Sequence, residues 1–126
     1  MDNLSSNELL VLRRQASEWR KLPTEEEASI DGKGLVSTIT SFEGKVGRIA
    51  VRVCRRESAL DPETVSYAIM GRQEDIELGN YSSSDLGGDV LEGAYRRTEG
   101  EYQEDLLRRS VEAIIHARML ISRTSR

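Results

Sequence analysis

Alternation of hydrophobic and polar residues is clearest between residues 45 and 58, which read KVGRIAVRVCRRES. Three β-branched residues hold alternate positions: Ile49, Val51 and Val53. This period of two predicts a strand over residues 46–55 with one buried face. Arginines follow a spacing of four along the chain, namely Arg48, Arg52 and Arg56. They form either a binding surface or the solvated side of the strand.

Two neighbouring segments have the composition of strands that pair with this one. Residues 35–42, LVSTITSF, are rich in β-branched residues. The dipeptide Glu43-Gly44 predicts a hairpin turn in which a two-residue loop pairs Phe42 with Lys45. Phe42 then shares the inner face with the β-branched residues above, whereas a three-residue loop reverses the faces. Alternation from Val65 to Ile69 predicts a third strand, and residues 74–79 a short fourth one.

The N-terminal region predicts a helix. Ser5 and Glu8 have the spacing of a capping box. Hydrophobic residues then recur at helical spacing, at Leu9, Leu12, Ala16 and Trp19. Pro23 ends this helix near Leu22. The acidic segment 24–27, TEEE, is expected to form an exposed connector or one more helical turn.

A second helix is expected near the C-terminus, from about Gly100 to Ser122, with Thr98 and Glu101 as its capping box. Its hydrophobic residues cover two adjacent stripes, which is wider than a narrow amphipathic seam. One stripe contains Leu106, Ser110, Ala113, Ala117 and Leu120, and the other contains Leu107, Val111, Ile114 and Ile121. Residues 79–100 predict a Gly/Ser-rich loop, and residues 123–126 a frayed tail.

These patterns together predict an α+β fold in a single domain, residues 1–126. We expect the two helices to lie on one face of a three- to five-stranded antiparallel sheet, because both flank the alternating segments in sequence. One sheet can cover only one side of the C-terminal helix. We therefore expect the exposed remainder, including Leu107, Ile114 and Ile121, to bind a protein partner or a second copy of the chain.

Composition narrows the possible functions. The net charge is −4, which disfavours extensive binding to nucleic acid or anionic membranes. The single cysteine, Cys54, excludes an internal disulfide and a multi-cysteine metal site. No apolar run approaches the roughly 20 residues that span a bilayer, and the N-terminus lacks a basic segment before its short apolar run. We expect a cytoplasmic protein that does not associate with membranes.

No motif predicts catalysis. His116 is expected to lie at the boundary of a packed helix, and Cys54 to be structural although Arg55 and Arg56 follow it. Asp85 and Asp89 lack the spacing of a calcium loop. Asp31-Gly32-Lys33-Gly34 precedes a strand, where a phosphate loop would precede a helix. We therefore predict that the protein is not an enzyme and uses no metal or other cofactor.

The order of helix, strands and helix resembles, in outline, double-stranded-RNA-binding domains and small acidic secretion chaperones. The RNA-binding domains usually begin their second helix with basic residues, whereas residues 98–105 read TEGEYQED. The chaperones usually have another helix that interrupts the sheet, and the pattern here places none. The resemblance therefore implies no site residue.

The leading functional hypothesis is a small acidic protein–protein interaction module: an adaptor, chaperone, inhibitor or assembly subunit. It would act through its C-terminal helix and sheet face. The alternative is a nucleic-acid-associated regulatory protein that uses the strand arginines. No aromatic residue lies between those arginines to stack on bases, so the alternative is the weaker hypothesis.

Overall fold

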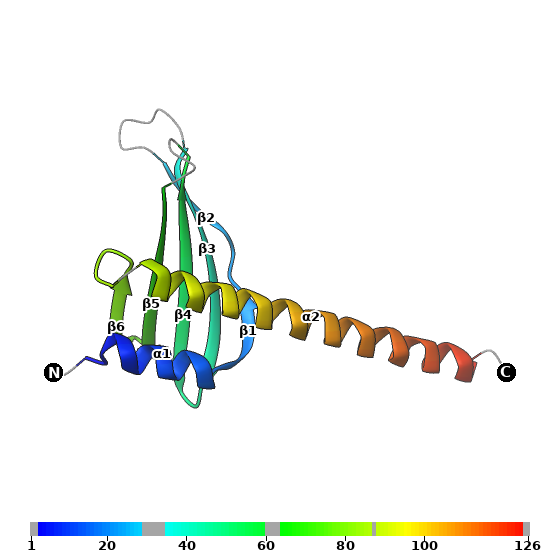
Figure 1. Cartoon of the computed structure of the whole chain (residues 1–126). Helices are drawn as coiled ribbons and strands as arrows, with labels where there is room; N and C mark the ends of the chain where they lie inside the picture. The colour runs from blue at the N-terminus through cyan, green and yellow to red at the C-terminus, as the bar shows by residue number, and fades with distance from the viewer. Residues whose placement is uncertain (1–2, 29–34, 60–63, 87, 125–126) are drawn as a thin grey trace.

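The computed structural model describes residues 3–28, 35–59, 64–86 and 88–124. Within these residues, two helices flank six strands (Figure 1). In order, the elements are α1 (Ser6–Gln15), β1 (Ser17–Lys21), β2 (Glu25–Ala28), β3 (Leu35–Val46), β4 (Ile49–Ser58), β5 (Val65–Gln73), β6 (Ile76–Ser82) and α2 (Gly88–Thr124). The segment that resembled a phosphate loop, residues 31–34, lies outside the described residues.

All six strands form one antiparallel sheet, in the order β1-β3-β4-β5-β6, with β2 also paired to β3. Both helices lie on the same face of this sheet (Figure 1). The predicted α+β class with two helices on one face is therefore confirmed. The predicted third and fourth strands exist as β5 and β6, and the sheet gains β1 and β2 beyond the expected number.

The β3–β4 hairpin turns later than predicted. Val46 pairs with Ile49, so that Gly47 and Arg48 form the turn, and Gly47 has a φ of 59°, which glycine adopts without strain. The predicted turn at Glu43-Gly44 is wrong, because both residues continue β3 opposite Arg52 and Val51. The loop still has two residues, but Phe42 pairs with Val53 and not with Lys45.

The N-terminal helix is shorter than predicted. The capping box of Ser5 and Glu8 is confirmed by a hydrogen bond in each direction. The helix ends at Gln15, however, and Trp19 belongs to β1, which pairs with β3. The acidic segment after Pro23 forms β2 and is neither a connector nor a helical turn. Strand pairing thus replaces the last turns of the expected helix.

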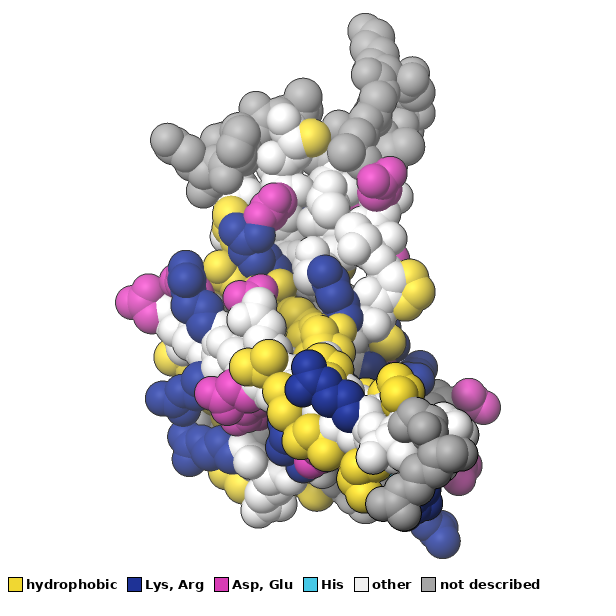
Figure 2. Space-filling view, turned by 90° about the vertical axis from the view of Figure 1, so that its right-hand side faces the viewer, with side chains coloured by type: hydrophobic (Ala, Val, Ile, Leu, Met, Phe, Trp, Pro, Cys, Tyr) yellow, Lys and Arg dark blue, Asp and Glu magenta, His cyan; other side chains and the backbone are white. Residues whose placement is uncertain are grey.

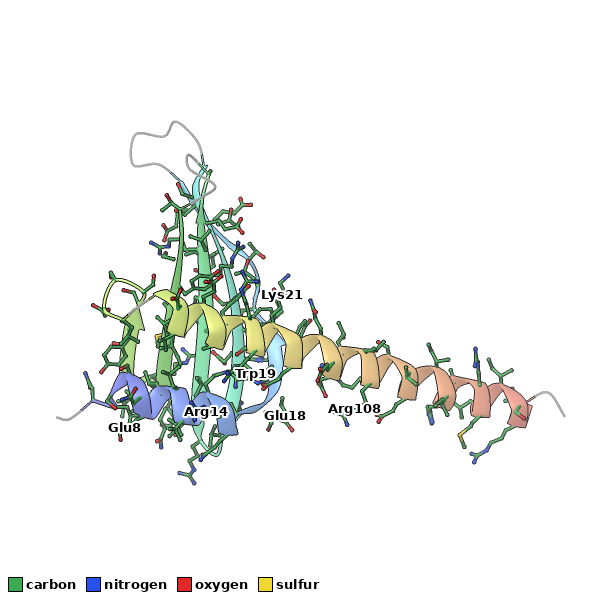
Figure 3. The ribbon with its side chains drawn as sticks, viewed as in Figure 1. Glu8, Arg14, Glu18, Trp19, Lys21 and Arg108 are labelled. Carbon is green, nitrogen blue, oxygen red and sulfur yellow. The ribbon has the colours of Figure 1, made fainter. Side chains whose placement is uncertain are left out.

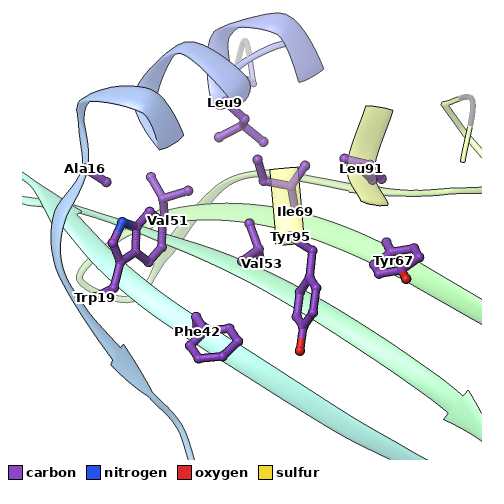
Figure 4. Packing of buried hydrophobic residues seen from close by; sticks show 10 residues of the cluster. All are labelled: Leu9, Ala16, Trp19, Phe42, Val51, Val53, Tyr67, Ile69, Leu91 and Tyr95. Atoms are coloured by element: carbon purple, nitrogen blue, oxygen red, sulfur yellow. The ribbon is translucent and has the colours of Figure 1, made fainter. Parts of the chain in front are cut away.

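A mixed aliphatic and aromatic core fills the space between the helices and the sheet (Figure 4). Leu9 of α1 and Leu91 of α2 lie over Val51 and Ile69, which are fully buried or nearly so. The other main members are Ala16, Trp19, Phe42, Val53, Tyr67 and Tyr95. The face of β4 that carries the β-branched residues is therefore the buried one, as the alternation predicts.

Helix α2 begins twelve residues before the predicted start, at Gly88 and not at Gly100. The expected loop over residues 79–100 is wrong: it contains the end of β6, a turn and the first part of α2. Leu91, Ala94, Tyr95 and Thr98 are buried at helical spacing. These residues hold the helix on the sheet despite the glycines around them. The helix also continues past the predicted end to Thr124.

The buried Thr98 is part of a polar cluster and does not cap a helix. Its hydroxyl donates to the carbonyl of Ala94 and accepts from Arg13 Nε at 3.0 Å. Glu101 accepts from Arg13 Nη2 and from Trp19 Nε1, both at 3.0 Å. Arg13 also lies over the Trp19 ring. This cluster joins α1, β1 and α2 where α2 leaves the sheet.

Candidate interaction surfaces

The second half of α2 extends beyond the sheet and packs against no other described element (Figures 1 and 3). We call residues 106–124 the α2 extension; every residue in it is exposed. Its predicted interface residues are no exception, since Leu107 is 67%, Ile114 51% and Ile121 64% exposed. Its exposed large hydrophobic residues are Leu106, Leu107, Val111, Ile114, Ile115, Met119, Leu120 and Ile121.

Most of these hydrophobic side chains share one side of the extension. At 100° per residue, Leu107, Ile114 and Ile121 fall within about 40° of one another. Leu91, which faces the sheet, lies about 140° around the helix from Ile114. Figure 2 looks at the side of the molecule to which α2 projects, and hydrophobic side chains and basic side chains, Lys or Arg, are exposed next to one another there. The apolar side of the extension is therefore distinct from the side that α2 turns to its own sheet.

Charge divides α2 into two parts. Residues 88–105 contain six acids and two arginines, whereas residues 106–124 contain four arginines and one glutamate. Asp105 pairs with Arg108 and Arg109 across the boundary, and the hydrogen bond from Arg108 lowers the pKa of its carboxyl. Within the described residues, Arg118 and Arg123 make no ion pair. The extension is therefore a basic amphipathic helix.

The second surface is the sheet face that neither helix covers. It contains a hollow of about 460 Å³, with Ile39 and Met70 among its apolar lining. Arg52 and Arg56 lie on this face, as their spacing predicts, whereas Arg48 lies in the exposed β3–β4 turn. The structure thus places two of the three predicted arginines on one surface.

Carboxylates neutralise these arginines. Glu43 is only 3% exposed and accepts hydrogen bonds from Arg52 at 3.0 Å and from Arg20 at 3.2 Å. Arg72 lies 3.8 Å from the same carboxylate. Burial alone would raise the pKa of Glu43, but the hydrogen bonds from Arg52 and Arg20 and the nearby arginine charges outweigh it and lower the pKa. Arg56 pairs with Glu27 at 2.9 Å.

The sequence candidates for chemistry are not brought together. Cys54 lies on the uncovered sheet face, where burial raises the pKa of its thiol although Ser41 donates to it at 3.2 Å. The higher pKa lowers the thiolate fraction, which agrees with a structural cysteine. His116 is exposed on the α2 extension and not at a packed boundary, since the helix leaves the sheet before that residue.

The carboxylate of Asp85 accepts hydrogen bonds from the backbone and side chain of Ser82 and stabilises the turn after β6. Asp89 lies in the first turn of α2. Among the described residues, no group of three His, Cys, Asp or Glu side chains is arranged to hold a metal ion. No described helix is both long enough and apolar enough to span a membrane.

A third surface was missed by sequence reasoning. An apolar groove of about 380 Å³ lies beside α1, lined by Leu4, Glu8, Val11 and Leu12 together with Ile49 of β4. Val11 does not belong to the helical stripe of hydrophobic residues that faces the sheet. A large hydrophobic residue outside that stripe is the signal in the sequence that could have indicated an exposed apolar surface on α1.

Comparison with known proteins identifies no relative: no family model, curated protein or solved structure matches this chain. Its function is therefore argued from its own surfaces.

Proposed function

We propose that this chain is a small non-enzymatic protein–protein interaction module, and that the apolar side of the α2 extension is its binding surface. The observation that carries the proposal is the set of large hydrophobic residues exposed on a helix that extends past its own sheet. Burying one such side chain contributes about 1.5–3 kcal/mol. Most of the stability of a helix in a protein comes from tertiary packing, which the extension lacks among the described residues, so a partner would stabilise it.

The chemistry of the other surfaces supports a protein partner over the alternative, nucleic acid. Arg52 and Arg56 on the uncovered sheet face are paired with Glu43 and Glu27, so binding phosphates there would require breaking both ion pairs. Aromatic rings, on which bases stack, pack in the core on the other face (Figure 4). A cytoplasmic location remains a prediction.

Affinity capture with two matched variants tests this proposal. Ile114→Glu places a charge in the middle of the apolar side of the extension, whereas Met119→Glu places the same charge about 140° away on the polar side. Both residues are about half exposed, so neither substitution should disturb the fold. Tagged chain is expressed in its native source at equal level, and bound proteins, including untagged copies, are quantified and then retested as purified components.

The proposal predicts a protein bound in near-stoichiometric amount to the wild-type chain and to Met119→Glu, and its loss with Ile114→Glu. Equal capture of the protein by all three chains would show that the binding surface is not the apolar side of the α2 extension. Absence of any stoichiometric protein on the wild-type chain would contradict an interaction function.

A further inference from the structure

The partner of the α2 extension can be specified from the spacing of its side chains. Placing Leu107, Ile114 and Ile121 at position a of a heptad repeat puts Ser110 and Ala117 at position d. Large and small residues therefore alternate along the seam. Two such seams fit together best when large residues of one helix lie on small residues of the other. In a parallel pair in register, Ser110 would meet Ser110 and Ala117 would meet Ala117, which leaves gaps.

From this pattern we propose that the α2 extension pairs with the α2 extension of a second copy, antiparallel and about a two-fold axis. The proposal rests on the proposed function and names its partner. In one antiparallel register, Leu107 lies on Ala117 and Ile114 lies on Ser110 of the second copy, and Ile121 then lies on the longer Gln103. The axis then passes near Glu112. Beside it, Val111 meets Val111 and Ala113 meets Ala113, and Leu106 meets Leu120.

The charges agree with this orientation independently of the packing. At the e positions, Glu104 of one helix lies beside Arg118 of the other, and neither side chain has an ion pair within the described part of its own chain. A parallel pair would instead place Glu99 beside Glu104, with like charges in contact. The acidic first part of each α2 thus lies beside the basic extension of the other copy.

The fold leaves room for the second helix. Gln103 and Glu104 are exposed where α2 leaves the sheet. The buried Thr98, which accepts a hydrogen bond from Arg13, lies about 140° around the helix from Gln103, and the buried Tyr95 lies about 80° from it. The end of the second helix would therefore lie along the side of α2 that carries the exposed Gln103 and Glu104.

Disulfide trapping in a Cys54→Ser background tests the orientation. Gln103→Cys and Ile121→Cys are prepared as separate full-length chains and oxidised singly or as an equimolar mixture. The proposal predicts a cross-linked dimer in the mixture, joining one chain of each kind, and none with either chain alone. Efficient cross-linking of Ile121→Cys to itself would show a parallel pair and overturn the proposal.

Exchanging the charges of Glu104 and Arg118 provides a second test. The dissociation constant of the dimer is measured by sedimentation of chains without cross-links over a dilution series. Glu104→Arg and Arg118→Glu are each expected to weaken the dimer roughly tenfold, since two exposed pairs are reversed, and the double variant to restore wild-type affinity. Failure of the double variant to restore it would contradict the pairing.

The outcomes separate this proposal from the more general function. The self-pairing proposal would be wrong if the measured mass of the wild-type chain stayed at 14.2 kDa at all concentrations. The interaction function would still hold if, in the same case, the wild-type chain bound a different protein and Ile114→Glu abolished that binding. Binding of a monomeric chain to vesicles of phosphatidylserine, abolished by the same substitution, would contradict both.

Discussion

At the scale of single residues, the contact between β1 and β3 depends on Gly44, which lies against the ring of Trp19. Glu43-Gly44 has the composition of a turn, but Gly44 is required for close approach. A Cβ atom on Gly44 would lie 2.8 Å from two atoms of the Trp19 ring. Among the described glycines, Gly47 is the one with positive φ. A sequence period reports which residues are apolar, whereas it cannot report a contact between β1 and β3, so this error had no local signal.

The buried carboxylate of Glu43 predicts a pH-dependent stability. Because its pKa is lowered in the folded chain from the ordinary 4.5, its contribution is complete above that value and is lost as pH falls through the lower folded value. Glu43→Gln should therefore reduce the free energy of unfolding at pH 7 by about 1.5–3 kcal/mol. The difference should shrink below pH 4.5.

Urea unfolding at a series of pH values measures this difference. Glu26→Gln is the control, because Glu26 is exposed on β2 and its substitution should change stability by less than about 0.5 kcal/mol. A difference between wild type and Glu43→Gln that stays constant from pH 7 to pH 3 would contradict the lowered pKa.

At the scale of elements, the strongest local patterns were predicted correctly and the weak ones were overridden by tertiary contacts. The alternation in β4 and β5 and the capping box of α1 correspond to observed elements. Ala16 and Trp19 fit a helical period equally well, but the pairing of β1 with β3 places the Trp19 ring over the sheet. The hydrophobic residues of the α2 extension were assigned to one helix correctly. The spacing of these hydrophobic residues could not show that the second half of α2 extends beyond the sheet.

Replacement of glycine by alanine is expected to have opposite effects on stability in β3, where β1 packs closely, and in α2. Gly44→Ala should destabilise the fold by about 1–3 kcal/mol, because its methyl group would collide with the buried ring of Trp19. Gly93→Ala should stabilise it by up to about 1 kcal/mol, because Gly93 lies inside α2 with nothing within 4 Å of the new atom. Thermal and urea unfolding of both variants measures the two signs, and destabilisation by Gly93→Ala would place an unseen contact on that side of α2.

At the scale of the whole molecule, the chain combines a small packed core with the α2 extension, which packs against no other described element. The polar cluster of buried Arg13, buried Thr98 and partly exposed Glu101 fixes α2 where it leaves the sheet, so the direction of the extension is set by the body of the protein. Two bodies joined through antiparallel extensions would lie at opposite ends of the pair. Their uncovered sheet faces and α1 grooves would remain accessible to further partners.

The exposure of the α2 extension in the single chain predicts how thermal stability depends on protein concentration. If association buries the α2 extension, mass action raises the apparent Tm of the wild-type chain with concentration. Ile114→Glu should remove that dependence while leaving the Tm at the lowest concentration unchanged, since Ile114 is exposed in the single chain. Met119→Glu should retain the wild-type slope. Calorimetric scans across a hundredfold range of concentration measure both quantities. A lower Tm for Ile114→Glu even in dilute solution would show that this side chain stabilises the single chain, because a purely intermolecular contact contributes nothing once the copies have separated.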